Sequence, residues 1–298
     1  KISAELGGYA HIKNPILGFA EFPVLWLPYL IVPLKSQRQS GLLVPSFSVY
    51  GDYKQTFQFK YFWAISDSQD LTTTLTTYKK GGEKLSLDYL FYLNQTSIGH
   101  LQAGTIQDRL FANSEQYSAS GGDHPHFNRW FLTYDHFYEL PEGFVQTAKL
   151  NLISDLLYPK DFASDMTGVG DPALENRLTL HRNSEKSHVS FDTDYYIDLL
   201  KQNVLSGNQG AVHRFPEIRY SVSETKIADS PLLFQLDTNY VNFARESLAY
   251  DKVTVVDSTR TIVTNPSATD NTAFNPSSGD IIRSGQRIDL QPKVSLPI

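Results

Sequence analysis

Apolar and polar residues alternate along most of the chain after Gly41. In the segment Thr56–Trp63, aromatic side chains occupy every second position, and Gln58 and Lys60 stand between them. A period of two residues is typical of a β-strand that has one apolar and one polar face. The same alternation returns in five further segments: Leu85–Phe91, Trp130–Tyr134, Leu178–His181, Val189–Tyr195 and Phe234–Tyr240. The pattern predicts about 12 antiparallel strands between Gly41 and Ile298.

The links between these strands differ in length in a regular way. The short links are Ala64–Asp70, Asn94–Thr96, Leu140–Gly143, Asn183–Lys186 and Ile227–Pro231. The long links are Asp108–Asn128, Leu156–Ala173, Lys201–Phe215 and Glu246–Gln286. Transmembrane β-barrels combine short periplasmic turns with longer outer loops. The sequence therefore predicts strands of such a barrel, with the segment before Gly41 on the periplasmic side.

The residues before Phe47 follow a different pattern. Short β-like pieces come first, and an apolar run with two prolines follows from Val24 to Leu34. A polar, basic stretch then precedes a second apolar run, Leu42–Phe47, which contains Pro45. Proline cannot donate to a β-ladder, so it occurs at strand edges and bulges. These prolines predict strands that are unpaired on one side or easily parted.

The stretch Phe22–Phe47 reads FPVLWLPYLIVPLKSQRQSGLLVPSF and resembles the junction of the LptD family (also called OstA or Imp), outer-membrane lipopolysaccharide-assembly proteins. Weaker similarities follow in the family's order: Tyr61–Ile65, Leu156–Asp165, Arg214–Ile218 and Arg287–Pro297. The resemblance implies an all-β chain in three parts. Residues 1–34 would end a periplasmic β-jellyroll, 35–40 would form a hinge, and 41–298 would form the N-terminal half of a large transmembrane barrel. The remaining strands would come from elsewhere in a longer protein, since the family's barrels close with roughly 26 strands.

The resemblance also implies a function, which is the insertion of lipopolysaccharide into the outer leaflet through a lateral exit near the first barrel strand. Apolar side chains and one proline would line that path: Leu25, Leu30, Leu43, Pro45 and Phe47. Lys35 and Arg38 would contact phosphates of the lipid, because arginine forks onto phosphate well. The implied partners are an LptE-like lipoprotein plug inside the barrel and an LptA-like periplasmic bridge that docks on the jellyroll. The family usually has a second proline where this chain has Lys60.

Composition narrows the candidate chemistry. The net charge of −6 argues against a nucleic-acid partner, and the absence of cysteine excludes disulfides within the chain.

Asp123-His124-Pro125-His126 is a possible metal site, but a polar outer loop explains it better because a third strong ligand is missing. Asp192 and Asp194 could be paired carboxylates, although a polar strand face accounts for both. Without a nucleophile elbow or a phosphate-binding loop, the sequence predicts no enzyme and no cofactor.

Several alternatives remain open at the level of sequence. A general outer-membrane pore or receptor for small solutes would share the alternation and the link lengths, but not the junction at 22–47. A soluble all-β binding protein would cover the aromatic strand faces with protein instead of lipid. Pro45 fits a tolerated edge or bulge position as well as it fits a weakened seam. Lys35 and Arg38 also fit a solvated basic linker.

Overall fold

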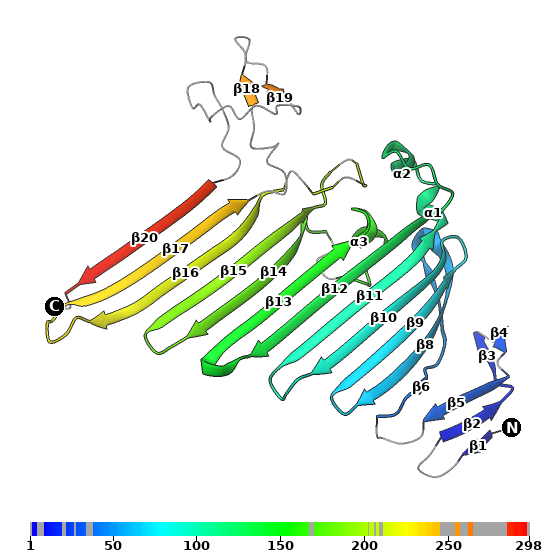
Figure 1. The fold of residues 1–298 in the computed structure, drawn as a ribbon. Helices are drawn as coiled ribbons and strands as arrows, with labels where there is room; N and C mark the ends of the chain where they lie inside the picture. Colours follow the sequence, from blue (N-terminus) through cyan, green and yellow to red (C-terminus); the bar gives the residue numbers. More distant parts are fainter. Residues whose placement is uncertain are drawn as a thin grey trace. The chain divides into compact units, whose positions relative to one another are not determined.

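The computed structural model of this chain describes residues 2–4, 9–19, 22–26, 28–33, 38–166, 170–201, 203–205, 207–208, 211–244, 254–256, 262–264 and 285–296. The described residues are dominated by antiparallel strands (Figure 1). Among the helices of these residues, none has the length and apolar character needed to cross a membrane. The all-β prediction is confirmed.

Within the described residues, five short strands precede Gly41. β1 (Ile2–Ala4), β2 (Tyr9–Lys13) and β5 (Tyr29–Pro33) form one small sheet in the order β1-β2-β5, and β3 (Ile16–Phe19) pairs with β4 (Phe22–Trp26) as a hairpin. The assignment of this part to a jellyroll, with a hinge at 35–40, remains a prediction.

One large sheet contains the remaining long strands, in the order β20-β17-β16-β15-β14-β13-β12-β11-β10-β9-β8-β6, with β7 also paired to β8. Their bounds are β6 (Gly41–Leu42), β7 (Ser46–Tyr50), β8 (Lys54–Ser66), β9 (Gln69–Tyr78), β10 (Gly82–Tyr92), β11 (Ile98–Asp108), β12 (Phe127–Glu139), β13 (Phe144–Ile153), β14 (Ala173–Asn183), β15 (Ser187–Asp198), β16 (His213–Lys226), β17 (Leu233–Ala244) and β20 (Gly285–Ser295). Because β6 and β7 both pair with β8, they are two halves of one interrupted strand. The described residues thus confirm the prediction of about 12 antiparallel strands.

The links contain short helices and turns. α1 (Arg109–Ala112) and α2 (Glu115–Ala119) connect β11 to β12, and α3 (Tyr158–Asp161) lies between β13 and β14. Single 3-10 turns, η1 (Gly51–Tyr53) and η2 (Pro141–Gly143), precede β8 and β13, and β18 (Thr254–Val256) pairs with β19 (Ile262–Thr264). The predicted alternation of short and long links is incomplete. The β7–β8 link is short although the alternation expects a long one there. The β9–β10 link is the tight hairpin turn that Lys79-Lys80-Gly81-Gly82 predicts, and Gly82, with φ 128°, permits it.

The chain divides into two compact units. The first contains Lys1–Asp135, Leu152–Thr167 and Asn203–Leu205, and the second contains His136–Asn151, Gly168–Gln202 and Ser206–Ile298.

In the first unit, the two faces of the strands differ sharply. Paired residues of an antiparallel sheet share a face, and the row Phe59, Leu75, Leu85 belongs to an apolar face on which Leu75 is 43% exposed and Leu85 45%. The neighbouring row, Gln58, Thr76, Lys84, belongs to a polar face on which Thr76 and Lys84 are buried. A water-soluble protein exposes its polar residues and buries its apolar ones. The reverse arrangement suits a sheet that turns one face to lipid.

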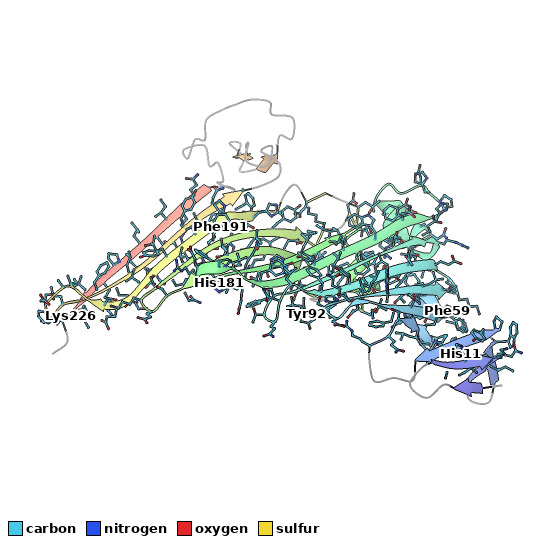
Figure 2. All side chains as sticks on the ribbon, turned by 60° about the horizontal axis from the view of Figure 1, so that its bottom comes forward. His11, Phe59, Tyr92, His181, Phe191 and Lys226 are labelled. Carbon is cyan, nitrogen blue, oxygen red and sulfur yellow. The ribbon has the colours of Figure 1, made fainter. Side chains whose placement is uncertain are left out.

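The second unit repeats this pattern. Phe191 of β15 is 40% exposed and pairs with Ile218 of β16, which is equally exposed. Asp194 of β15 and Glu217 of β16 are almost fully buried. Figure 2 shows side chains projecting from the strands and labels Phe59 of the first unit and Phe191 of the second.

Candidate functional site

The first long strand is interrupted at Pro45. β6 pairs with β8 through Leu42 and Tyr61, and β7 resumes the pairing through Ser46 and Gln58. The first strand advances four residues, from Leu42 to Ser46, while β8 advances only three, from Tyr61 to Gln58. One extra residue on one of two paired strands defines a β-bulge. The Leu43 N–H still donates to the Lys60 carbonyl at 2.8 Å, whereas Pro45 has no N–H to donate. The interruption thus has a direct cause in the sequence.

The apolar side chains next to this interruption are exposed. Val44 is 66% exposed, Leu43 41% and Phe47 40%. Within the described residues, only β8 pairs with β6 and β7, so their other edge carries no strand. The sequence prediction that Pro45 marks an edge or bulge position is therefore consistent with the observed pairing.

The other predicted path residues lie earlier in the chain. Leu25 lies on β4 opposite Leu17, and Leu30 lies on β5 opposite Ile12. Their roles in a lipid path remain predictions.

Of the two predicted phosphate contacts, the structure describes only Arg38. Lys35 lies outside the described residues. The Arg38 guanidinium pairs with the Asp70 carboxylate, donates to the Asp67 carbonyl at 3.1 Å and lies 5.8 Å from the centre of the Phe62 ring. Arg38 therefore links the residues just before the first strand to the β8–β9 turn through an ion pair and a hydrogen bond. Its contact with phosphate stays a prediction.

The polar face of the first unit contains a concavity of ≈ 330 Å³. Amide and hydroxyl side chains from β8 to β11 supply much of its lining, together with two lysines: Gln58, Lys60, Thr74, Thr76, Lys84 and Gln102. Lys60 enters it from β8, directly across from the interruption of the first strand.

Next to this concavity, a buried ionic cluster forms around Arg129 of β12. The Arg129 side chain is fully buried, and its Nε and Nη2 donate to the two carboxylate oxygens of Asp155 at 2.9 and 2.8 Å. Its Nη1 donates to Asp108 at 3.0 Å and to Asp161 at 2.9 Å. The Tyr53 hydroxyl donates to Asp108 at 2.5 Å and accepts from Nη1 at 3.1 Å. A buried arginine needs such partners because an unpaired buried charge is very costly.

A second cation, Lys84 of β10, lies in the same face. Lys84 pairs with Asp165, which also accepts a hydrogen bond of 2.8 Å from the Tyr158 hydroxyl. The lysine Nζ lies 4.4 Å from the centre of the Phe162 ring, and the Arg129 Cζ lies 4.1 Å from the centre of the Phe111 ring. Such cation–π contacts add to the stability of desolvated cations.

The β13–β14 link supplies most of these partners. Asp155, Tyr158, Asp161, Phe162 and Asp165 all come from the eleven residues 155–165, and four of the five make polar or ionic contacts to the two cations or to each other. Burial raises the pKa of the Tyr158 hydroxyl above its ordinary value, so it stays a donor. Burial also raises the pKa of the Asp161 carboxyl, while Arg129 opposes that shift. The predicted outer loop 156–173 is thus folded onto the polar face over the part that is described.

Sequence reasoning missed this cluster. Arg129 and Lys84 occupy ordinary polar positions in their strands, and nothing in the alternation marks them as buried. One signal was available in the sequence of this link. Its aromatic residues at 158 and 162 are unusual in a freely solvated loop, and its aspartates at 155, 161 and 165 could pair with buried cations.

The second unit has its own ionic network on the polar face. Asp194 is contacted by Arg177 at 2.6 Å and by Arg214 at 3.3 Å. Asp192 accepts hydrogen bonds from Thr179 at 2.6 Å and from Ser190 at 2.9 Å. The two aspartates therefore have separate sets of partners, as a polar strand face would give them.

The metal candidate is solvent-exposed. The Asp123 and His124 side chains are 84% and 74% exposed and lie 3.4 Å apart. In the part of the chain that the structure describes, no group of three or more metal-binding side chains occurs.

An antiparallel sheet of long strands, with exposed apolar residues on one face and buried charges on the other, has the character of an outer-membrane β-barrel segment. Residues 127–298 match the family model described as LptD, LPS transport system D, and the chain belongs to this family. The family membership expected from the sequence is confirmed.

Relatives in several bacteria carry the name LPS-assembly protein LptD. The protein of Aliivibrio fischeri (strain ATCC 700601 / ES114) is 23% identical over 97% of this chain and 30% of the relative. The protein of Shewanella sp. (strain ANA-3) is 24% identical over 80% of this chain and 29% of the relative. The protein of Burkholderia ambifaria is 29% identical over 51% of this chain and 18% of the relative. The chain thus spans less than a third of the length of these relatives.

Proposed function

We propose that this chain is the part of an outer-membrane lipopolysaccharide-assembly protein that releases lipopolysaccharide into the outer leaflet beside the first barrel strand. Family membership and the names that the relatives carry support lipopolysaccharide as the substrate. The observation that carries the location is the interruption between Leu43 and Ser46, at a sheet edge with exposed apolar side chains.

The interruption makes this edge easier to part. A backbone hydrogen bond contributes about 0.5–1.5 kcal/mol net to stability, so a strand that lacks one at Pro45 separates at lower cost than an unbroken strand. Acyl chains would pass from Leu25 and Leu30 to Leu43 and Phe47, while the saccharide follows the polar face. Lys35 and Arg38 would meet the phosphates between these two regions.

The proposal includes an arrangement in the cell. Residues 1–34 would belong to a periplasmic jellyroll, 35–40 to a hinge and 41–298 to the outer-membrane barrel. An LptE-like lipoprotein would plug the barrel, and an LptA-like bridge would deliver lipopolysaccharide to the jellyroll. Release requires no bond to be made or broken, so the proposed action is transport without catalysis.

The experiment is site-specific photo-crosslinking in cells with the full-length protein. A photoreactive residue replaces Leu25, Leu30, Leu43 or Phe47, and adducts are detected by blotting for lipopolysaccharide. We expect adducts at these four positions and none at Ser118 of α2. A folded, assembled protein without adducts at any of the four would contradict the proposal and favour a general pore for small solutes.

A further inference from the structure

Lys60 is a cation that the fold turns inward at the interrupted strand. Its backbone carbonyl accepts the last bond before the interruption, from Leu43, and its side chain lines the concavity on the polar face. The side chain is half-buried. Among the described residues, no carboxylate forms an ion pair with it.

Of the other charged side chains that line the concavity, Lys84 and Asp165 form an ion pair with each other, and Asp88 is held by hydrogen bonds. Asp88 accepts hydrogen bonds from His100 at 2.8 Å and from Gln102 at 3.1 Å. Lys60 is therefore the cation of this concavity that forms no ion pair in the described part of the chain, and an anionic partner would stabilise its half-buried ammonium.

The surroundings of Lys60 indicate what that anion would be attached to. Lys60 pairs with Thr74 and Thr74 pairs with Ser86, so a lysine and two hydroxyls form one row across three strands. Gln58 and Thr76 form the neighbouring row. Hydroxyl and amide groups bind the hydroxyls of a sugar, and an ammonium binds phosphate.

We propose that Lys60 and the adjoining hydroxyl and amide side chains form a recognition site for a phosphorylated saccharide, just inside the interrupted strand. This inference rests on the proposed function, because the phosphate would belong to the headgroup of the lipid in transit. The site would hold the headgroup on the polar face while the acyl chains stay on the apolar face with Phe47, which pairs with Phe57.

The test uses the full-length protein purified with its native partners in lipid. A photoreactive residue at Ser164, which lines the concavity but lies outside the proposed row, reports the yield of lipopolysaccharide adducts, and a second one at Phe47 reports passage at the edge. The variants are Lys60→Ala and Lys60→Arg, with Lys79→Ala in the exposed β9–β10 turn as the matched control. The ligands are intact lipopolysaccharide, the same lipid after phosphatase treatment, and inorganic phosphate as a competitor.

We expect Lys60→Ala to lower the Ser164 adduct yield about tenfold with intact lipopolysaccharide, since one charge-assisted hydrogen bond is lost. Lys60→Arg restores the yield, Lys79→Ala leaves it unchanged, and the phosphatase-treated lipid shows little dependence on Lys60. Equal yields in Lys60→Ala and the unmodified protein would overturn the inference. Full competition by millimolar inorganic phosphate would also overturn it, because the site would then bind free phosphate.

The Phe47 probe separates the two proposals. If Phe47 adducts persist and the Ser164 adduct yield does not depend on Lys60, only the proposed recognition site is wrong. If neither position forms adducts, the proposed function is wrong.

Discussion

At the scale of single residues, Arg129 shows how a charged side chain is accommodated without water. Three aspartates and one tyrosine hydroxyl satisfy its donors, and Phe111 lies against its guanidinium. Such a cluster contributes little net stability compared with apolar packing, but it becomes very costly once a partner is removed. It therefore holds the β13–β14 link in a single position.

This reasoning predicts the effect of Asp155→Asn. The substitution removes the carboxylate that Arg129 contacts through two hydrogen bonds and leaves the guanidinium buried with less compensation. We expect a loss of about 3–5 kcal/mol in the free energy of unfolding, measured by urea titration in detergent. Asp237→Asn is the control, because Asp237 is exposed and accepts a hydrogen bond of 3.3 Å from Gln235. Equal stability of the two variants would show that the cluster does not hold the fold.

Sequence alone could not identify these residues. Alternation assigns a residue to a face, but burial on the polar face depends on which link folds over it. Here the β13–β14 link covers Arg129 and Lys84, and that is a tertiary effect. The edge role of Pro45, in contrast, follows from its missing N–H and could be anticipated.

At the scale of elements, period-two patterning predicted the strands well because each strand has two different environments. The short helices were not predicted. α1 and α3 have four residues each, too few to be stable without their context. The side chain of Asp108 accepts from the N–H groups of Leu110 and Phe111 and so starts α1, but Asp108 also belongs to the buried cluster, which no local pattern reveals.

The interrupted strand gives a prediction at this scale. Pro45→Ala restores an N–H at the interruption and allows one further bond to β8 or to the opposite edge, worth about 0.5–1.5 kcal/mol. We expect amide hydrogen exchange of residues 43–47 to slow about two- to tenfold, measured by mass spectrometry in lipid. Pro141→Ala in η2 serves as the control and should leave these amides unaffected. Unchanged or faster exchange in Pro45→Ala would mean that the proline does not weaken the strand.

At the scale of the whole molecule, the two faces and the family membership lead to one picture. The exposed apolar residues suit contact with lipid, the buried charges suit the polar side, and the interrupted strand lies at one end of the strand order. The junction sequence at 22–47 by itself indicates the same family. The aromatic residues of the β13–β14 link indicate that it is buried, but only the structure shows which charges it covers.

The central claim is that lipopolysaccharide leaves beside the interrupted strand. Any lipid-facing residue of the outer leaflet can contact resident lipopolysaccharide, so the decisive measurement compares two phenylalanines of equal exposure, Phe47 and Phe191, each 40% exposed. Photoreactive residues replace each of them in the full-length protein, and adducts of newly made, isotope-labelled lipopolysaccharide are followed over time. The account predicts that labelled adducts reach Phe47 first and reach Phe191 only as label accumulates in the membrane. The same time course at both positions would contradict it.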